Sequence, residues 1–270
     1  MTKSNILTRR TILAGAAAGL TSAAAPSTVS AQTPGAPKTF LLVHGAWRGA
    51  WCWRPVADRL QARGHKVFTP TLTGLADRSH LLDAKVNLTT HINDIANLIK
   101  WERLDNVVLV GHSYGGFVVS GVAEKAGDRI ASIVYADAFV PDDGENLIDQ
   151  VPRIRQAIDQ LTAKGEIAMP ASPSSFYNPT LNAKDSAWID AMCTSQPNAA
   201  FIEKIVLTGA RDRIARKTYI RAKGFSTPPF DNGLSKARAN KWHTHELPCG
   251  HDLMIEMPDE TTDILLQAAA

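Results

Sequence analysis

The chain carries a serine between two glycines, in the stretch Gly111-His112-Ser113-Tyr114-Gly115, directly after an apolar run. A Gly-x-Ser-x-Gly turn between a strand and a helix holds the serine hydroxyl clear of a sheet, where it can act as a nucleophile. The strained turn needs glycines, because a side chain at Gly111 or Gly115 would collide with the neighbouring strand or helix. We therefore predict that Ser113 is a catalytic nucleophile. The alternative is an ordinary glycine turn.

A serine nucleophile needs a base that removes its proton, and histidine is the usual base. Of the eight histidines, His251 fits best. It lies in a loop after the last predicted strand, where chains with this serine turn place the base. His44 and His112 lie inside glycine turns and are expected to support the structure. His251 is accordingly the predicted general base.

Attack on a carbonyl creates an oxyanion that needs two backbone N–H donors, and the loss of one such donor costs about 3 kcal/mol. The N–H of Tyr114, directly after the serine, is one expected donor. The second is expected from Ala46 in the loop Gly45-Ala46-Trp47, which follows the first predicted strand. Glycine at position 45 allows the chain to bend there.

Predicted strands and helices alternate through the first half of the chain, which favours an α/β fold with a mostly parallel central sheet and helices on both faces. Prolines interrupt short helical patterns from about residue 142 to 206, so this segment is predicted to be a helical cap insertion in a domain that spans residues 38–270. Strand signals occur at residues 39–43, 65–70, 106–110, 130–135, 217–221 and 243–247, and the first of these is a short apolar run typical of a buried strand. Helical periodicity covers residues 50–63, 88–101 and 115–125, and a last helix begins near Pro258.

Residues 1–31 have the layout of an export signal peptide. A short basic region ends in Thr8-Arg9-Arg10-Thr11-Ile12, which resembles a bacterial twin-arginine signal. An apolar stretch too short to span a bilayer then leads to the small-x-small site Val29-Ser30-Ala31. The alternative is an ordinary secretory signal that contains two arginines. Both interpretations place the mature protein in the periplasm or outside the cell.

Charge and cysteine content argue against several classes of function. The export segment holds Lys3, Arg9 and Arg10 and no acid, so it accounts for the whole formal charge of +3. The neutral remainder gives no reason to expect nucleic acid or a membrane as a partner. Three cysteines are too few for a disulfide framework. His243 and His245 alternate on a strand without a nearby carboxylate cluster, so we expect no metal site, and the chemistry requires no cofactor.

Four stretches resemble the branch of the α/β-hydrolase superfamily that contains plant methylesterases, hydroxynitrile lyases and many bacterial esterases. They read FLLVHGAWRGAWCW, VVLVGHSYGGFVVS, YADAFVPDDGE and GHDLMIEMPDE. The resemblance covers nearly all of residues 38–270 and is weakest between Asn146 and Lys217. It implies an α/β-hydrolase fold. In this branch the His-Gly-Ala loop and the residue after the serine form the oxyanion hole, in agreement with Ala46 and Tyr114.

The chain departs from the plant enzymes at the acid of the expected Ser-His-Asp triad. Those enzymes carry an aspartate after the strand that here covers residues 217–221, but the following AKGFS contains no carboxylate. A histidine without its carboxylate partner costs several orders of magnitude in rate. Asp137 is the predicted acid because it ends the strand after the serine helix, the equivalent of a strand end at which haloalkane dehalogenases place an acid. The alternatives are Asp231 as the acid, or a capping role for Asp137.

The predicted function is a serine hydrolase that cleaves a carboxylic ester of a small, apolar or aromatic substrate through an acyl-enzyme intermediate. Hydroxynitrile lyases of this branch carry a lysine after the catalytic histidine and a threonine at the position of Gly45. This chain has Asp252 after the histidine, and an acid there would repel departing cyanide. A lyase, or a ligand-binding protein without turnover on the same fold, is the alternative.

Aromatic residues in the oxyanion loop, at a strand end and in the insertion are candidates to line the substrate pocket, although each could equally belong to the core. They are Trp47, Phe139 and Trp188. Three charged side chains in loops of the same region, Arg48, Arg78 and His80, are expected to be solvated rather than to bind substrate. The expected partner is a small-molecule ester, without a stable membrane anchor.

Overall fold

The computed structural model describes residues 36–171, 181 and 183–270. The predicted export signal at residues 1–31 lies outside the described residues. Residues 35–270 form one compact unit. Within the described part of the chain, no helix is both long and apolar enough to cross a membrane.

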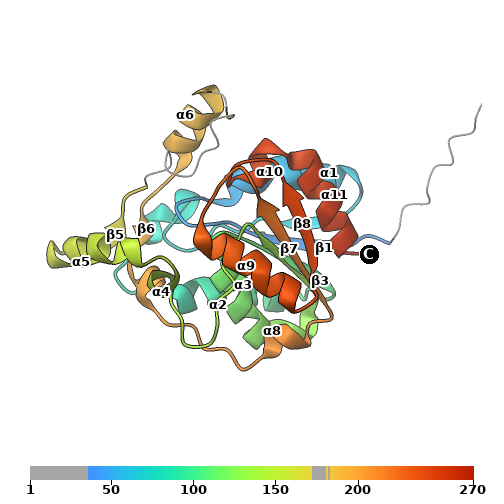
Figure 1. Ribbon diagram of the computed structural model, residues 1–270, viewed down its shortest axis with the longest axis horizontal. Helices are drawn as coiled ribbons and strands as arrows, with labels where there is room; N and C mark the ends of the chain where they lie inside the picture. Colours follow the sequence, from blue (N-terminus) through green and yellow to red (C-terminus); the bar gives the residue numbers. More distant parts are fainter. Residues whose placement is uncertain (1–35, 172–180, 182) are drawn as a thin grey trace, which may run out of the picture. The chain divides into compact units, whose positions relative to one another are not determined.

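A six-stranded sheet forms the centre of the molecule, in the order β2-β1-β3-β4-β7-β8 (Figure 1). Every adjacent pair of strands is parallel. The carboxyl ends of these strands therefore lie along one edge of the sheet, where the loops that follow them can meet. The strands are β1 (Thr39–Val43), β2 (Lys66–Phe68), β3 (Val107–His112), β4 (Ile130–Ala136), β7 (Arg216–Ala222) and β8 (His243–Leu247).

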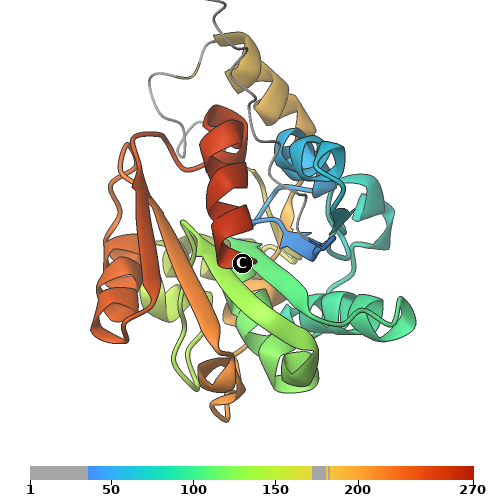
Figure 2. The same ribbon diagram turned by 90° about the vertical axis from the view of Figure 1, so that its right-hand side faces the viewer.

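Helices cover both faces of the sheet, and alternate strand residues pack against each layer. In β1, Leu41 and Val43 belong to one hydrophobic cluster and Phe40 and Leu42 to the other. This alternation follows from the two-residue repeat of a strand that is buried on both sides. One face carries α1 (Arg54–Ala62), α10 (Leu253–Glu256) and α11 (Pro258–Ala268), which lies across the sheet in Figure 2. The other carries α2 (Leu88–Trp101), α3 (Gly115–Ala126), α8 (Ala210–Arg213) and α9 (Pro228–Ala239).

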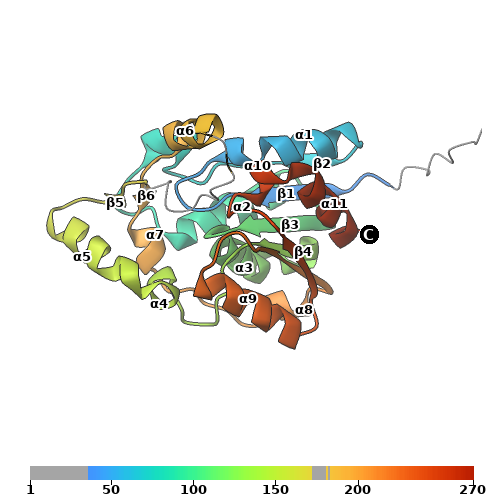
Figure 3. The same cartoon turned by 45° about the horizontal axis from the view of Figure 1, so that its top comes forward.

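The segment between β4 and α8 contains short elements that gather at one end of the molecule (Figure 3). The sequence predicts short helices here and no strands, yet two-residue strands β5 and β6 pair antiparallel. Ile205 N–H donates to Glu145 O (2.8 Å), and Asn198 N–H to Ile167 O (3.0 Å), so backbone hydrogen bonds tie the segment together. The elements are α4 (Leu147–Gln150), α5 (Arg155–Ala163), β5 (Ala168–Met169), α6 (Ala183–Met192), β6 (Gln196–Pro197) and α7 (Ala199–Ile202).

Candidate active site

Ser113 lies in the sharp turn between β3 and α3, with a positive φ of 54°. The flanking glycines leave no room for side chains. A Cβ at Gly111 would come within 2.6 Å of Gly115 O, and a Cβ at Gly115 within 2.9 Å of His44 O. The backbone at the start of α3 and the backbone directly after β1 therefore pack tightly against the turn that carries the serine. This contact explains why the chain interrupts an apolar run with two glycines.

His251 lies in the loop after β8 and contacts Asp137, which directly follows β4. His251 Nδ1 lies 2.7 Å from Asp137 Oδ2, and both side chains are buried. Asp137 has a positive φ of 44°, and its N–H donates to Ile220 O at 2.7 Å. Aspartate is among the residues that tolerate this conformation, which turns the carboxylate towards the histidine. Asp231, the alternative acid, instead pairs with Arg221.

Aromatic rings surround the His251 imidazole. Phe230 stacks on it with ring centroids 4.9 Å apart and an interplanar angle of 14°, and Phe225 lies 5.0 Å away. His112 packs against it at 4.5 Å. His112 Nε2 must be the donor in its 2.9 Å hydrogen bond to His251 O, because a carbonyl oxygen only accepts. Burial, with a smaller contribution from His251, keeps the pKa of His112 well below its ordinary value, so this histidine is neutral at pH 7.

The two expected oxyanion donors are the backbone N–H groups of Tyr114 and Ala46. Among the residues that the structure describes, neither the Tyr114 N–H nor the Ala46 N–H donates to a backbone or side-chain acceptor. The next N–H in the loop, that of Trp47, is already bound to Gln196 Oε1 at 3.1 Å. Ala46, Ser113 and His251 line the same small cavity. The geometry thus leaves the two N–H groups named from the sequence free to bind an anion.

The Tyr114 hydroxyl is buried and lies 2.9 Å from His91 Nδ1. His91 Nε2 donates to Thr73 O at 2.9 Å, so Nδ1 is the acceptor for the tyrosine proton. Burial raises the pKa of Tyr114 well above its ordinary value. This chain of hydrogen bonds fixes the tyrosine ring as one wall of the site.

Arg48 is buried, contrary to the expectation that it is solvated. Its Nε and Nη2 bind Asp252 Oδ1 and Oδ2 at 3.1 and 2.8 Å, and only 2% of the residue is exposed. Burial alone would raise the pKa of Asp252, but the Arg48 guanidinium lowers it to about 2. Asp252 is therefore ionised, and Arg48 balances its charge. The expectation that Asp252 repels an anion does not take this ion pair into account. Arg78, which pairs with half-buried Asp94, is partly buried, and His80 is exposed.

An apolar cavity of about 60 Å³ adjoins Ser113. Of the three aromatic candidates, Trp47 and Phe139 line it. Trp188 is not one of its lining residues in the described part of the chain; it packs against Trp51 at 5.0 Å and is 41% exposed. The other walls come mainly from Leu147, Val151, Ile154, Phe201, Phe225 and Phe230.

A larger hollow of about 850 Å³ lies elsewhere, at the amino ends of β3 and β4. Its walls include Lys100, Arg103 and Arg129, whose charged groups are solvated. We assign the site to the smaller cavity because it adjoins Ser113 and His251. In the described ranges, no group of three or more His, Cys, Asp or Glu side chains is arranged to bind a metal ion.

The sequence analysis did not identify Arg221 as a partner of Asp137 or Arg48 as a partner of Asp252. A signal for Arg221 was present, because it lies between Ile220 and Ala222 near the end of a predicted central strand, and a buried charge requires a buried partner. Nothing in the sequence near Arg48 indicates that its partner is 204 positions away.

Comparison with known proteins matches this chain to one family and to named esterases. A sequence profile of the Alpha/beta hydrolase family matches residues 40–264. The carbendazim hydrolyzing esterase of Nocardioides sp. (strain SG-4G) is 39% identical over 238 residues, which is 84% of this chain and 97% of that protein. Methylesterase 7 of Arabidopsis thaliana is 36% identical over 107 residues, 39% of this chain and 41% of that protein.

A solved structure, an extracellular alpha/beta-hydrolase from a Paenibacillus species, superposes with a TM-score of 0.76. The two chains are 24% identical, and the match covers 86% of this chain and 99% of the other. At this identity the superposition shows a shared fold.

Proposed function

Because this chain belongs to the alpha/beta hydrolase family, we propose that it is a serine esterase with Ser113 as nucleophile, His251 as base and Asp137 as acid. The observation that carries the proposal is the buried 2.7 Å contact between His251 Nδ1 and Asp137 Oδ2. His251 also lines the same small cavity as Ser113. The esterase names of its relatives support the same reaction.

In the proposed mechanism, His251 removes the Ser113 proton while the serine oxygen attacks the ester carbonyl. The Ala46 and Tyr114 N–H groups stabilise the negative charge that develops on the carbonyl oxygen. His251 then protonates the leaving alcohol, and it later activates the water that releases the acid from the acyl-enzyme. Asp137 accepts a hydrogen bond from the Nδ1–H of His251, which leaves Nε2 as the basic nitrogen for the serine.

The substrate in this proposal is a small ester with an apolar acyl group. The cavity beside Ser113 is lined mainly by aliphatic and aromatic side chains, and Arg153 is its one charged lining residue in the described part of the chain. A volume of about 60 Å³ favours short chains or a single ring over a long lipid.

A lyase reaction of the hydroxynitrile type fits this site poorly. The lyases that the sequence resembles place a threonine where this chain has Gly45. A Cβ at Gly45 would come 2.8 Å from Ser113 Cβ and 2.9 Å from His112 Nδ1, so no side chain fits there without moving the nucleophile. The Arg48–Asp252 pair also leaves no free cation at the position of the lyase lysine.

The test measures hydrolysis of p-nitrophenyl esters from acetate to octanoate, with carbendazim as a further substrate, by the wild type and the Ser113→Ala, Asp137→Asn and Asp231→Asn variants. We expect turnover in the wild type, none above background in Ser113→Ala, and a loss of about 10⁴-fold in Asp137→Asn. Labelling of Ser113 by a fluorophosphonate provides a second readout. Turnover that survives in Ser113→Ala contradicts the proposal, and loss in Asp231→Asn as large as that expected for Asp137→Asn contradicts the assignment of the acid.

A further inference from the structure

We propose that Arg221 and Asp231 act together as positioning residues for Asp137: Arg221 fixes the orientation of the Asp137 carboxylate, and Asp231 offsets the charge of Arg221. The inference rests on the proposed function, in which Asp137 orients His251. Arg221 is the second-last residue of β7, and no carboxylate follows it through Ser226.

The two carboxylate oxygens of Asp137 have different hydrogen-bond partners. Its Nη1 binds Asp137 Oδ1 at 2.8 Å, and the Ala222 N–H donates to the same oxygen at 3.0 Å. The other oxygen, Oδ2, faces His251 at 2.7 Å. With Oδ1 held by two donors, the carboxylate cannot rotate away from the histidine without breaking charge-assisted hydrogen bonds.

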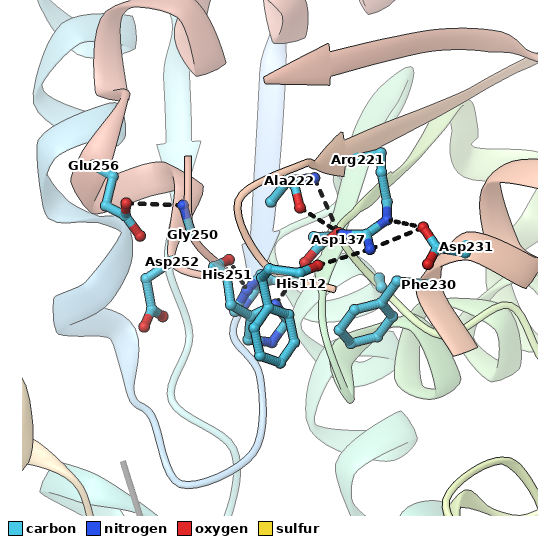
Figure 4. A network of polar contacts seen from close by, with 12 residues as sticks. His112, Asp137, Arg221, Ala222, Phe230, Asp231, Gly250, His251, Asp252 and Glu256 are labelled. Carbon is cyan, nitrogen blue, oxygen red and sulfur yellow. Dashed lines mark hydrogen bonds and ion pairs between the residues drawn. The ribbon is translucent and has the colours of Figure 1, made fainter. Parts of the chain in front are cut away.

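Arg221 is itself immobilised. Its Nη1 also donates to Ala222 O at 2.5 Å, its Nη2 to Phe225 O at 2.7 Å, and its Nε to Asp231 Oδ1 at 2.9 Å. Only 1% of the residue is exposed. Figure 4 shows the guanidinium between the two aspartates. The planar fork of an arginine can make these contacts at once, whereas a lysine ammonium cannot.

The charges of the network explain why a second aspartate is present. Asp137 and Arg221 alone would cancel, and a neutral pair stabilises a protonated histidine less than a carboxylate does. Asp231, whose side chain is 49% exposed, restores one negative charge to the group. When His251 takes up the serine proton, the four side chains together become neutral. Asp231 therefore preserves the attraction between Asp137 and the imidazolium.

Phe230 links the same groups on a second side. Its ring stacks on His251, and the Arg221 guanidinium carbon lies 5.9 Å from the ring centroid. Phe230 directly precedes Asp231 near the start of α9, so the helix that carries the offsetting charge also supports the imidazole. The position of α9 therefore places both the Phe230 ring and the Asp231 carboxylate.

The experiment compares Arg221→Met, Arg221→Lys and Asp231→Asn in the full chain. The controls are Arg59→Met and Asp259→Asn, which break an exposed arginine–aspartate pair of the same kind between α1 and α11. Readouts are kcat and KM for p-nitrophenyl butyrate, thermal unfolding, and the far-downfield proton NMR signal of the His251 Nδ1–H that bonds Asp137. This signal reports the orientation of the pair whether or not the protein turns over an ester.

We expect Arg221→Met to lower kcat on the order of 100-fold and Asp231→Asn about tenfold, each with KM nearly unchanged, by analogy with the outer partners of metal-bound histidines. Arg221→Lys should recover part of the loss, and the NMR signal should disappear in Arg221→Met and move in Asp231→Asn. Asp231→Asn keeps the test decisive if Arg221→Met does not fold, because the aspartate is half exposed.

An unchanged kcat and NMR signal in folded Arg221→Met, or in Asp231→Asn if Arg221→Met does not fold, overturns the inference. The same holds if the control variants lose as much activity as the network variants. If the wild type turns over no ester but its downfield signal is lost in Arg221→Met, the positioning role stands and the proposed function fails.

Discussion

Arg48 and Asp252 form a buried, bidentate ion pair that joins the loop after β1 to the loop that carries His251. The first loop supplies the Ala46 N–H and the second the imidazole, so the pair holds together two parts of the site that are far apart in sequence. Arg48 Nη1 also donates to Cys193 Sγ at 3.1 Å, which connects the pair to the end of α6. The ion pair therefore links three segments around one cavity.

Removing one partner of this pair should destabilise the protein strongly. Arg48→Met leaves Asp252 charged and buried, and we expect the free energy of unfolding to fall by about 3–5 kcal/mol. The double variant Arg48→Met/Asp252→Leu should be more stable than Arg48→Met alone, because it leaves no unpaired charge. Urea unfolding measures these two variants and Asp252→Leu, with the exposed Arg63–Asp263 pair as a control that should change little. A double variant as unstable as the sum of its single variants would show that the pair is not coupled.

Gly116 should not tolerate a methyl group. A Cβ at this position would lie 2.0 Å from Phe139 O, so Gly116→Ala must push α3 away from the loop after β4. We expect a loss of at least about 2 kcal/mol in the free energy of unfolding and a loss of esterase activity. Gly127→Ala is the matched control, because its φ is −59° and its nearest contact is 3.9 Å away. Equal stability of the two variants contradicts this prediction.

Filling the cavity beside Ser113 should reduce the length of the acyl chain that the site accepts. Val151→Trp places a large ring in the wall of this cavity, and we expect kcat/KM for the octanoate ester to fall at least about tenfold while the acetate ester changes about twofold. The control is Val206→Trp at a position that is 74% exposed. Parallel losses for both esters would mean that the acyl group binds elsewhere.

His44 should make stability depend on pH. Its Nδ1 lies 2.8 Å from Gly45 O, and its Nε2 accepts from the Leu72 N–H at 3.0 Å, so the native state needs the neutral ring. Burial lowers the pKa of His44 from 6.5 to about 4. The unfolded chain binds the proton first as pH falls, so this contribution is fully present above pH 6.5 and is lost towards pH 4, a change of about 3 kcal/mol.

The measurement is urea unfolding between pH 4 and 7 for the wild type and His44→Gln. The pKa values of His91 and His112 are also lowered by burial and act in the same direction, so the difference between the two proteins isolates His44. Identical slopes of stability against pH would rule out this role for His44.

The order of strands and helices followed from local patterns. Strand patterns of five or six residues predicted the six strands of the sheet, and β1 and β8 begin and end at the predicted residues. The central strands β1 and β3 are the clearest, because a strand that is buried on both faces is almost entirely apolar. The helices α2 and α11 also begin where the helical periodicity placed them, whereas β5, β6 and α9 were missed because short or mixed segments carry no clear period.

The sequence by itself determined that this chain forms an α/β-hydrolase fold with Ser113 in a strained glycine turn and His251 after the last strand. The positions of Ser113 and His251 follow from sequence patterns within a few residues of each. Only the tertiary structure decided which aspartate meets His251, because the two residues are 114 positions apart. The parallel pairing of β4 with β7 brings Asp137 to Arg221, and α9 turns Asp231 to the same guanidinium. Strand order sets those distances, and no local pattern encodes it.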